Sequence, residues 1–101
     1  MPEWYAACGS GELDAGRAIL REVGGLKLAL LREGDSIVAL SDRCPHAGGS
    51  LGRGWVEEGE LVCPLHRWRF RLADGRCTTM RGQSVHRFRA ERRGEEVWVL
   101  V

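Results

Sequence analysis

Two short segments of this chain each combine a cysteine with a histidine. Cys44-Pro45-His46 is followed, after sixteen intervening residues, by Cys63-Pro64-Leu65-His66. Thiolate sulfur and imidazole nitrogen are both metal ligands, and the glycines and prolines around them are typical of loops. The alternating order predicts that each loop gives one sulfur to one metal ion and one nitrogen to another, so that two loops clamp a binuclear group.

This pattern resembles the Rieske family, whose [2Fe–2S] cluster has two cysteines on one iron and two histidines on the other. The resemblance implies one such cluster. Cys44 and Cys63 would bind a buried iron through sulfur. His46 and His66 would bind the outer iron through one ring nitrogen each, with the other nitrogen near solvent. An electron would leave at that exposed edge.

The length of the chain predicts a single domain of residues 1–101. The resemblance also implies an all-β, antiparallel fold, with a β base and a small cluster-binding subdomain of about residues 43–72. Glycines and charged turns punctuate the chain and independently favour short strands. The expected strands are Leu26–Arg32, Ser36–Leu40, Glu60–Val62, Arg67–Leu72 and Glu95–Val101. Residues 13–23 fit a short helix or a strand, and Gly16 favours a strand from about Arg17.

Several residues around the two motifs suit a cluster pocket. Residues 48–52, Gly-Gly-Ser-Leu-Gly, let the backbone approach closely and aim N–H groups at electron-rich sulfides. Pro45 and Pro64 restrict the backbone beside each cysteine. Trp68 follows the second motif and is expected to cover the cluster with an apolar ring.

The chain departs from the membrane-complex members of the family. Those proteins have a disulfide between the loops, whereas the matching positions here are Gly49 and Leu65. They also have serine and tyrosine hydroxyls where this chain has Trp68 and Phe70. The chain therefore resembles the soluble ferredoxin branch, although Arg67 stands where that family usually has glycine.

Charge is distributed unevenly along the chain. Residues 1–42 carry a net −3, residues 43–93 carry +6 and residues 94–101 carry −2. We expect some of Arg53, Arg67, Arg69 and Arg71 to surround the electron exit, whereas Arg92 is predicted in the turn before the last strand. A redox partner would then offer an acidic patch.

Alternatives to a cluster follow from the same residues. Zinc takes these ligand types, so a structural zinc module is the alternative from a different functional class, although the single-residue gap of Cys44-Pro45-His46 is unusual for zinc. A nucleic-acid-binding role is not expected, because no such motif accompanies the arginines. His86 is interpreted as an ordinary residue, and Cys8 and Cys77 as free thiols.

The resulting hypothesis is a non-catalytic electron carrier. It would accept electrons from a flavin reductase and pass them to a terminal oxygenase or another oxidoreductase, and the alternative is the small subunit of NADH-dependent nitrite reductase. An oxygenase would need a further iron site with two histidines and a carboxylate, and His86 alone is left over. The N-terminal sequence lacks the features of a signal peptide, and no apolar run could span a bilayer, so a cytoplasmic location without membrane contact is expected.

Overall fold

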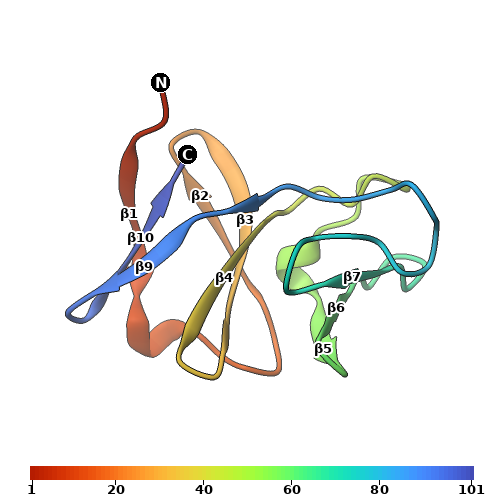
Figure 1. Ribbon diagram of the computed structural model, residues 1–101, viewed down its shortest axis with the longest axis horizontal. Coiled ribbons are helices and arrows are strands. Elements are labelled where there is room, and N and C mark those ends of the chain that lie inside the picture. Colours follow the sequence, from red (N-terminus) through yellow and green to blue (C-terminus); the bar gives the residue numbers. More distant parts are fainter.

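The computed structural model describes residues 1–101, which form ten β-strands, two short 3₁₀ helices and their connecting loops. The strands make up three sheets with antiparallel pairing. Figure 1 shows two lobes, a larger base that contains both chain termini and a smaller lobe built around β5, β6 and β7. The all-β antiparallel fold expected from the sequence is confirmed.

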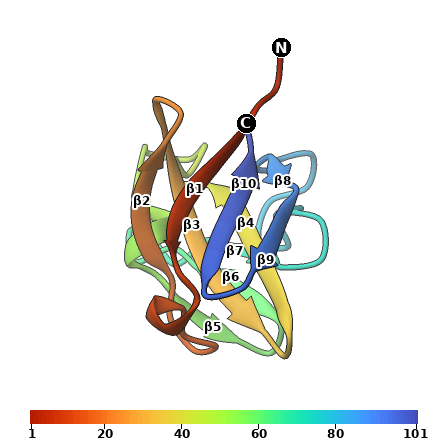
Figure 2. The same cartoon turned by 90° about the vertical axis from the view of Figure 1, so that its left-hand side faces the viewer.

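The base consists of two sheets that pack face to face, as Figure 2 shows from the side of the base. The three-stranded sheet has the order β1-β10-β9, and the four-stranded sheet has the order β2-β3-β4-β8. The strand bounds are β1 Trp4–Gly9, β2 Ile19–Val23, β3 Leu26–Glu33, β4 Ser36–Ser41, β8 Arg87–Phe88, β9 Ala90–Arg93 and β10 Glu96–Leu100. The core between the sheets is made of Leu13, Val23, Leu28, Leu30, Ala39, Val97 and Val99.

Strand β3 is buried on both faces, which accounts for its continuous apolar sequence. Leu28 and Leu30 point into the core between the base sheets, whereas Ala29 and Leu31 belong to a second core. Successive side chains in a strand point to opposite faces, so one apolar run supplies two cores. Strands covered on both faces characteristically lack the polar alternation of surface strands.

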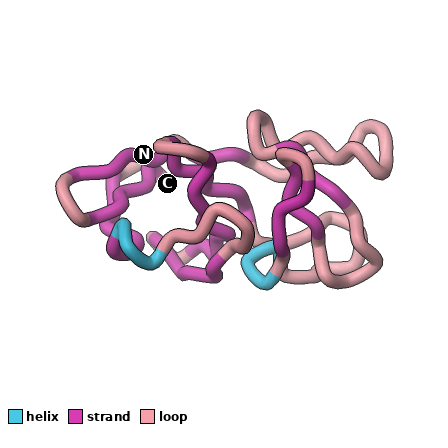
Figure 3. The backbone as a smooth tube through the Cα atoms, turned by 90° about the horizontal axis from the view of Figure 1, so that it is seen from below, coloured by secondary structure: helices cyan, strands magenta, loops and turns pink.

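The smaller lobe carries a three-stranded sheet in the order β5-β6-β7. Its strands are β5 Trp55–Glu57, β6 Glu60–Val62 and β7 Arg69–Arg71. Figure 3 shows the two 3₁₀ helices, η1 (Ser10–Glu12) in the base and η2 (Leu51–Arg53) where the chain enters the smaller lobe. The second core joins both lobes, because it contains β3 and β4 residues of the base together with Leu61 and Phe70 of the smaller lobe.

Much of the expected strand pattern is confirmed. β3 and β4 form the predicted hairpin, and their last pair, Glu33 with Ser36, encloses a two-residue turn in which Gly34 has φ +60°. Of the two central residues only Gly34 has positive φ, as in a type II′ hairpin turn, which takes glycine at its first central position. β6 and β10 also lie where expected, and the ambiguous segment forms β2, beginning at Ile19.

The remaining strands differ from expectation. β1, β5, β8 and β9 were not anticipated, because they are short or lack a regular apolar alternation. Arg92 lies within β9 and not in the turn before the last strand, since β9 gains its hydrogen bonds by pairing with β10. β7 is shorter than the predicted Arg67–Leu72, because Arg67 has φ +57° and cannot be part of an extended strand. Neither helix has the length and apolar character needed to cross a membrane.

Candidate functional site

Ligand loop 1 (residues 43–50) follows the end of β4 and closes on itself through backbone hydrogen bonds. The Cys44 amide donates to the Gly49 carbonyl at 2.8 Å, and the Gly48 amide donates to the Cys44 carbonyl at 2.9 Å. This turn buries the Cys44 side chain, which is 1% exposed, while His46 remains exposed at its tip. Loop 1 therefore buries one of its two predicted ligands, Cys44, and exposes the other, His46.

A buried carboxylate below loop 1 holds the following turn in place. The Ser50 hydroxyl and the Gly52 amide donate to Asp42 Oδ1 at 2.8 and 2.6 Å. The Leu51 amide donates to the Asp42 carbonyl at 2.8 Å. The amides of Leu51 and Gly52 are thus bound to Asp42, which corrects the expectation that residues 48–52 as a group aim their amides at the cluster.

Asp42 is the main site residue that the motifs did not identify. Aspartate side chains commonly accept hydrogen bonds from backbone amides in turns, so an aspartate just before a glycine-rich segment was an available signal. A Cβ added at Gly52 would lie 2.8 Å from Asp42 Oδ1 and 2.7 Å from the Leu20 Cβ. This close approach requires glycine at position 52.

Ligand loop 2 (residues 63–68) connects β6 to β7 through a turn with unusual backbone angles. The Cys63 amide donates to the Trp68 carbonyl at 2.8 Å, which closes the loop. Within it, His66 and Arg67 adopt φ values of +66° and +57°. Residues other than glycine rarely adopt such angles, which tend to occur at functional sites. The loop brings His66 to the surface while Cys63 stays fully buried.

The two loops bring the four predicted ligands together as two pairs. His46 Nε2 lies 2.7 Å from His66 Nδ1 at the exposed tip. Cys44 and Cys63 lie in the same buried core. No three His, Cys, Asp or Glu side chains are grouped closely enough to surround one metal ion. Two sulfur donors at depth and two nitrogen donors at the surface match a binuclear group with two ligands on each metal.

Burial dominates the acid–base properties of the Cys63 thiol. It raises the pKa of the Cys63 thiol to about 11, with the nearby Cys44 and Asp42 adding to the rise and a hydrogen bond from the Leu65 amide opposing it. Metal binding requires thiolates, so an iron ion would have to displace the proton from this sulfur. The donor set fits an iron–sulfur group whose metal ions supply positive charge in an apolar surrounding.

Gly49 marks the point where the two loops meet. A Cβ added there would lie 2.8 Å from Cys63 Sγ and 2.9 Å from Leu65 Cβ. Gly49 and Leu65, which the family resemblance matches to the disulfide of membrane-complex proteins, are therefore adjacent. Here glycine permits direct loop contact without that bond.

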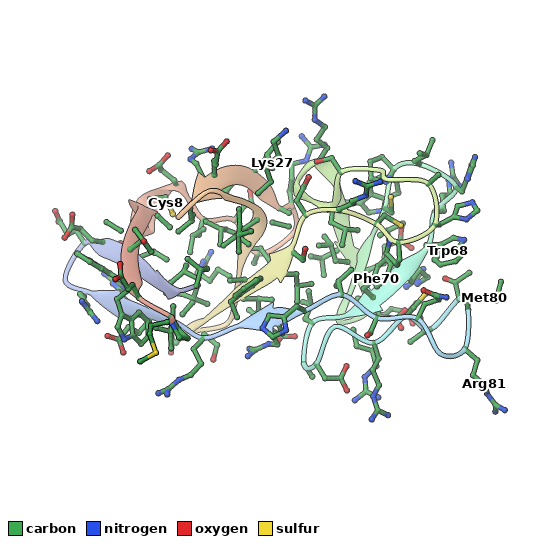
Figure 4. The ribbon with its side chains drawn as sticks, turned by 90° about the horizontal axis from the view of Figure 1, so that it is seen from above. Cys8, Lys27, Trp68, Phe70, Met80 and Arg81 are labelled. Carbon is green, nitrogen blue, oxygen red and sulfur yellow. The ribbon has the colours of Figure 1, made fainter.

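Two aromatic residues lie near the predicted ligands, Trp68 at the surface and Phe70 in the core. The indole of Trp68 is stacked on the His46 ring, with centroids 4.4 Å apart and planes inclined by 15°. Phe70 is fully buried in the core that also contains Cys44 and Cys63. Figure 4 shows Trp68 near the outer end of the smaller lobe and Phe70 further inside.

The four arginines expected near the exit have different environments. Arg69 Nε lies 2.6 Å from Glu60 Oε1, and the guanidinium also bonds Glu57. Arg71 lies 3.4 Å from Asp74. Arg53 and Arg67 are exposed and have no ion-pair partner. Of the four, only these last two are free of an ion pair within the chain.

The remaining candidate residues lie outside the paired donors. His86 is exposed and meets the Phe88 ring edge-on at a centroid distance of 4.4 Å. Cys77 is buried in the shared core, and Cys8 is half-buried in β1. The structure brings neither thiol into a ligand pair.

Comparison with known proteins identifies the relatives of this chain. A family model described as the Rieske [2Fe-2S] domain matches residues 3–89. The oxygenase subunit of 3-chlorobenzoate-3,4-dioxygenase from Comamonas testosteroni is 46% identical over 79 residues, covering 76% of this chain and 18% of that protein. The chain spans about a fifth of the length of such curated relatives.

Two similar solved structures are themselves short chains. One, described as an NADH-dependent nitrite reductase small subunit from Mycobacterium tuberculosis, has a TM-score of 0.90 and 26% identity, covering 100% of this chain and 96% of that one. The other is the ferredoxin of carbazole 1,9a-dioxygenase from Nocardioides aromaticivorans IC177. Its TM-score is 0.86 and its identity 29%, with coverage of 98% of this chain and 96% of that one.

Proposed function

Because this chain belongs to the Rieske [2Fe–2S] domain family, we propose that it carries single electrons from a reductase to an oxygenase or another terminal oxidoreductase. The main support for this proposal is that the two cysteines are buried, whereas the two histidines are exposed and lie side by side. Such an arrangement insulates one side of a redox group and leaves the other accessible to a partner protein.

The proposed ligands are Cys44 and Cys63 for the inner iron and His46 and His66 for the outer iron. The bound cluster supplies a centre that gains and loses one electron. The burial of both cysteines keeps water from the sulfur ligands. The exposed imidazoles bring the site's edge to the surface, and the stacked Trp68 restrains the plane of the His46 ring.

The proposed role includes no substrate chemistry in this chain. Beyond the four proposed ligands, the sequence has only His86 as a further histidine. A mononuclear oxygenase iron needs two histidines and a carboxylate. Substrate turnover would therefore belong to a partner, and we propose a flavin reductase as donor and a terminal oxygenase as acceptor. The ferredoxin structure supports this role, because it matches nearly the full length of both chains.

A second candidate role is the non-catalytic small subunit of an NADH-dependent nitrite reductase. It is favoured by the TM-score of 0.90 to a structure described in those words, which this chain matches over its full length. Affinity capture from the native cell distinguishes the two roles. A large sirohaem reductase retained in stoichiometric amount supports the subunit role, whereas its absence together with an oxygenase supports the ferredoxin role.

The cofactor is tested by analysis of the purified protein. We expect a red-brown protein with about two irons and two acid-labile sulfides per chain, and a rhombic EPR signal of low average g after reduction. Single substitution of Cys44, Cys63, His46 or His66 by alanine should abolish that signal. A colourless protein with one zinc per chain would instead establish the structural zinc module.

Electron transfer is tested directly by rapid mixing. The flavin reductase from the same cell, reduced with NADH, should bleach the visible absorption of the cluster-loaded protein in the stopped-flow instrument. Adding the oxygenase from that cell should restore the absorption. A cluster-loaded protein that neither partner reduces or reoxidises would refute the proposed function.

A further inference from the structure

A pocket of about 560 Å³ lies between the base and ligand loop 1. Its walls come from the start of β3, the end of β4, loop 1 and β8. Three hydrophobic residues line it, Leu26, Ala47 and Phe88. Leu26 is 46% exposed, which is high for a leucine at the start of a buried strand. None of these residues is a proposed cluster ligand.

Two cations without ion-pair partners border this pocket, here called the loop-1 pocket. They are Lys27 and Arg43, and neither is within salt-bridge distance of a carboxylate. Figure 4 shows Lys27 pointing away from the body of the molecule at the start of β3. Asp42 also lines the pocket, but this residue is only 7% exposed, and its carboxylate accepts hydrogen bonds from Ser50 and Gly52. The charge available to a ligand is therefore positive.

The loop-1 pocket is connected directly to the proposed redox site. Ala47 and Gly48 are both pocket walls and members of loop 1, immediately after His46. The guanidinium of Arg43 lies against Gly48, with its Nε 3.7 Å from where a Cβ of that glycine would be. A carboxylate bound to Arg43 would therefore sit beside the loop that presents His46.

We propose that the loop-1 pocket anchors the reductase by receiving an acidic side chain of that protein together with an apolar neighbour. Lys27 and Arg43 bind the carboxylate, and Leu26 and Phe88 contact the apolar neighbour. Small-molecule sites are lined predominantly by apolar residues, whereas only three of the eight residues here are hydrophobic, which favours a protein side chain. This inference rests on the proposed electron-carrier function and specifies the partner's surface.

The experiment measures reduction of the cluster-loaded protein by the NADH-reduced flavin reductase from the same cell. Lys27→Gln and Arg43→Gln should each lower the second-order rate constant about 3- to 10-fold at low ionic strength, and they should flatten its salt dependence. Arg89→Gln is the matched control, since Arg89 is an exposed cation without an ion pair outside this pocket. It should leave the rate within about twofold of wild type.

A chemical cross-link gives an independent readout. Lys27 is the only lysine in the sequence, so carbodiimide coupling of a lysine amine to a reductase carboxylate reports on this pocket alone. Mass spectrometry should find Lys27 joined to an aspartate or glutamate of the reductase, and Arg43→Gln should reduce the yield several-fold.

The outcomes separate this inference from the function on which it rests. The anchoring role of the pocket is overturned if the reductase reduces wild type and both pocket variants at the same rate and no Lys27 cross-link forms. That result leaves the proposed electron-carrier function standing. Failure of the reductase to reduce wild type overturns both. The EPR signal of each variant must match wild type, and Lys27→Gln remains decisive if Arg43→Gln alters the cluster.

Discussion

At the residue scale, Arg67 combines an unfavourable backbone angle with an exposed charge that forms no ion pair. A left-handed conformation costs a residue with a Cβ about 1–2 kcal/mol. Arg67 has φ +57°, is exposed, and directly follows His66. The sequence resemblance places glycine there in most of the family. We therefore infer that Arg67 makes a functional contact with a partner.

We predict that Arg67→Glu slows electron transfer to an acidic partner about tenfold or more at low salt and leaves the cluster spectrum largely intact. The reason is that it replaces attraction with repulsion next to the histidine edge. Arg92→Glu is the control, because Arg92 lies in β9 of the base. Transfer rates that respond neither to salt nor to Arg67 would show that this arginine is only part of a solvated face.

Phe70 is a second residue that we expect to influence the potential of the cluster. It is fully buried in the same core as Cys44 and Cys63 and offers no hydroxyl. Hydrogen bonds to the sulfurs raise the potential of iron–sulfur centres by stabilising the more negative reduced form. Since Trp68 also lacks a hydroxyl, we expect a midpoint near the low end of the roughly −150 to +300 mV Rieske range.

The corresponding substitution is Phe70→Tyr, which should raise the midpoint potential if its hydroxyl reaches a cysteine sulfur. Phe70→Leu is the control, because it changes packing without adding a donor. Both are measured by redox titration followed by EPR or visible spectroscopy. A wild-type midpoint above about +200 mV would contradict the assignment of a low potential to the missing hydroxyls.

At the scale of elements, the two ligand loops are held in different ways. Loop 1 depends on Asp42, which connects the end of β4 to Ser50, Leu51 and Gly52. Loop 2 has no equivalent carboxylate and is closed by the backbone bond from Cys63 to Trp68. Loop 1 should therefore be the more sensitive to a single side-chain change.

We predict that Asp42→Ala lowers the free energy of unfolding by about 1–3 kcal/mol, because the buried Gly52 amide loses its acceptor. The variant should also lose its visible absorption faster than wild type. Ser50→Ala, which removes a single donor to Asp42, should cost about 0.5–1.5 kcal/mol. Urea titration of the cluster-free proteins gives the first quantity, and the decay of absorbance in air gives the second. An Asp42→Ala protein as stable as wild type would show that the turn holds without the carboxylate.

At the scale of the whole molecule, both lobes build the core that buries the cysteines. That burial raises the pKa of Cys63 from 9.0 to about 11. In the cluster-free protein, the unfolded thiol ionises at a lower pH than the folded one. The contribution of the Cys63 thiol to the free energy of unfolding is thus fully present below pH 9 and is lost as the pH rises toward about 11.

We therefore expect the free energy of unfolding of the cluster-free protein to fall between pH 9 and about 11. The part of this fall that is due to the Cys63 thiol should be absent in Cys63→Ala. The measurement is urea denaturation at a series of pH values. Equal pH dependence in the wild type and Cys63→Ala would place the loss at another group that titrates at alkaline pH, such as the half-buried thiol of Cys8.

The order of the residues was enough to predict the ligand motifs, the β3–β4 hairpin and the strand character of the segments around them. These depend on residue spacing, side-chain alternation and turn chemistry, which are local properties of the chain. Which arginines stay unpaired depends on tertiary contacts, since Arg69 meets Glu57 and Glu60 across neighbouring strands. The role of Asp42 and the existence of β9 depend on such contacts too, because a buried hydrogen bond and an edge pairing arise only when distant segments are brought together.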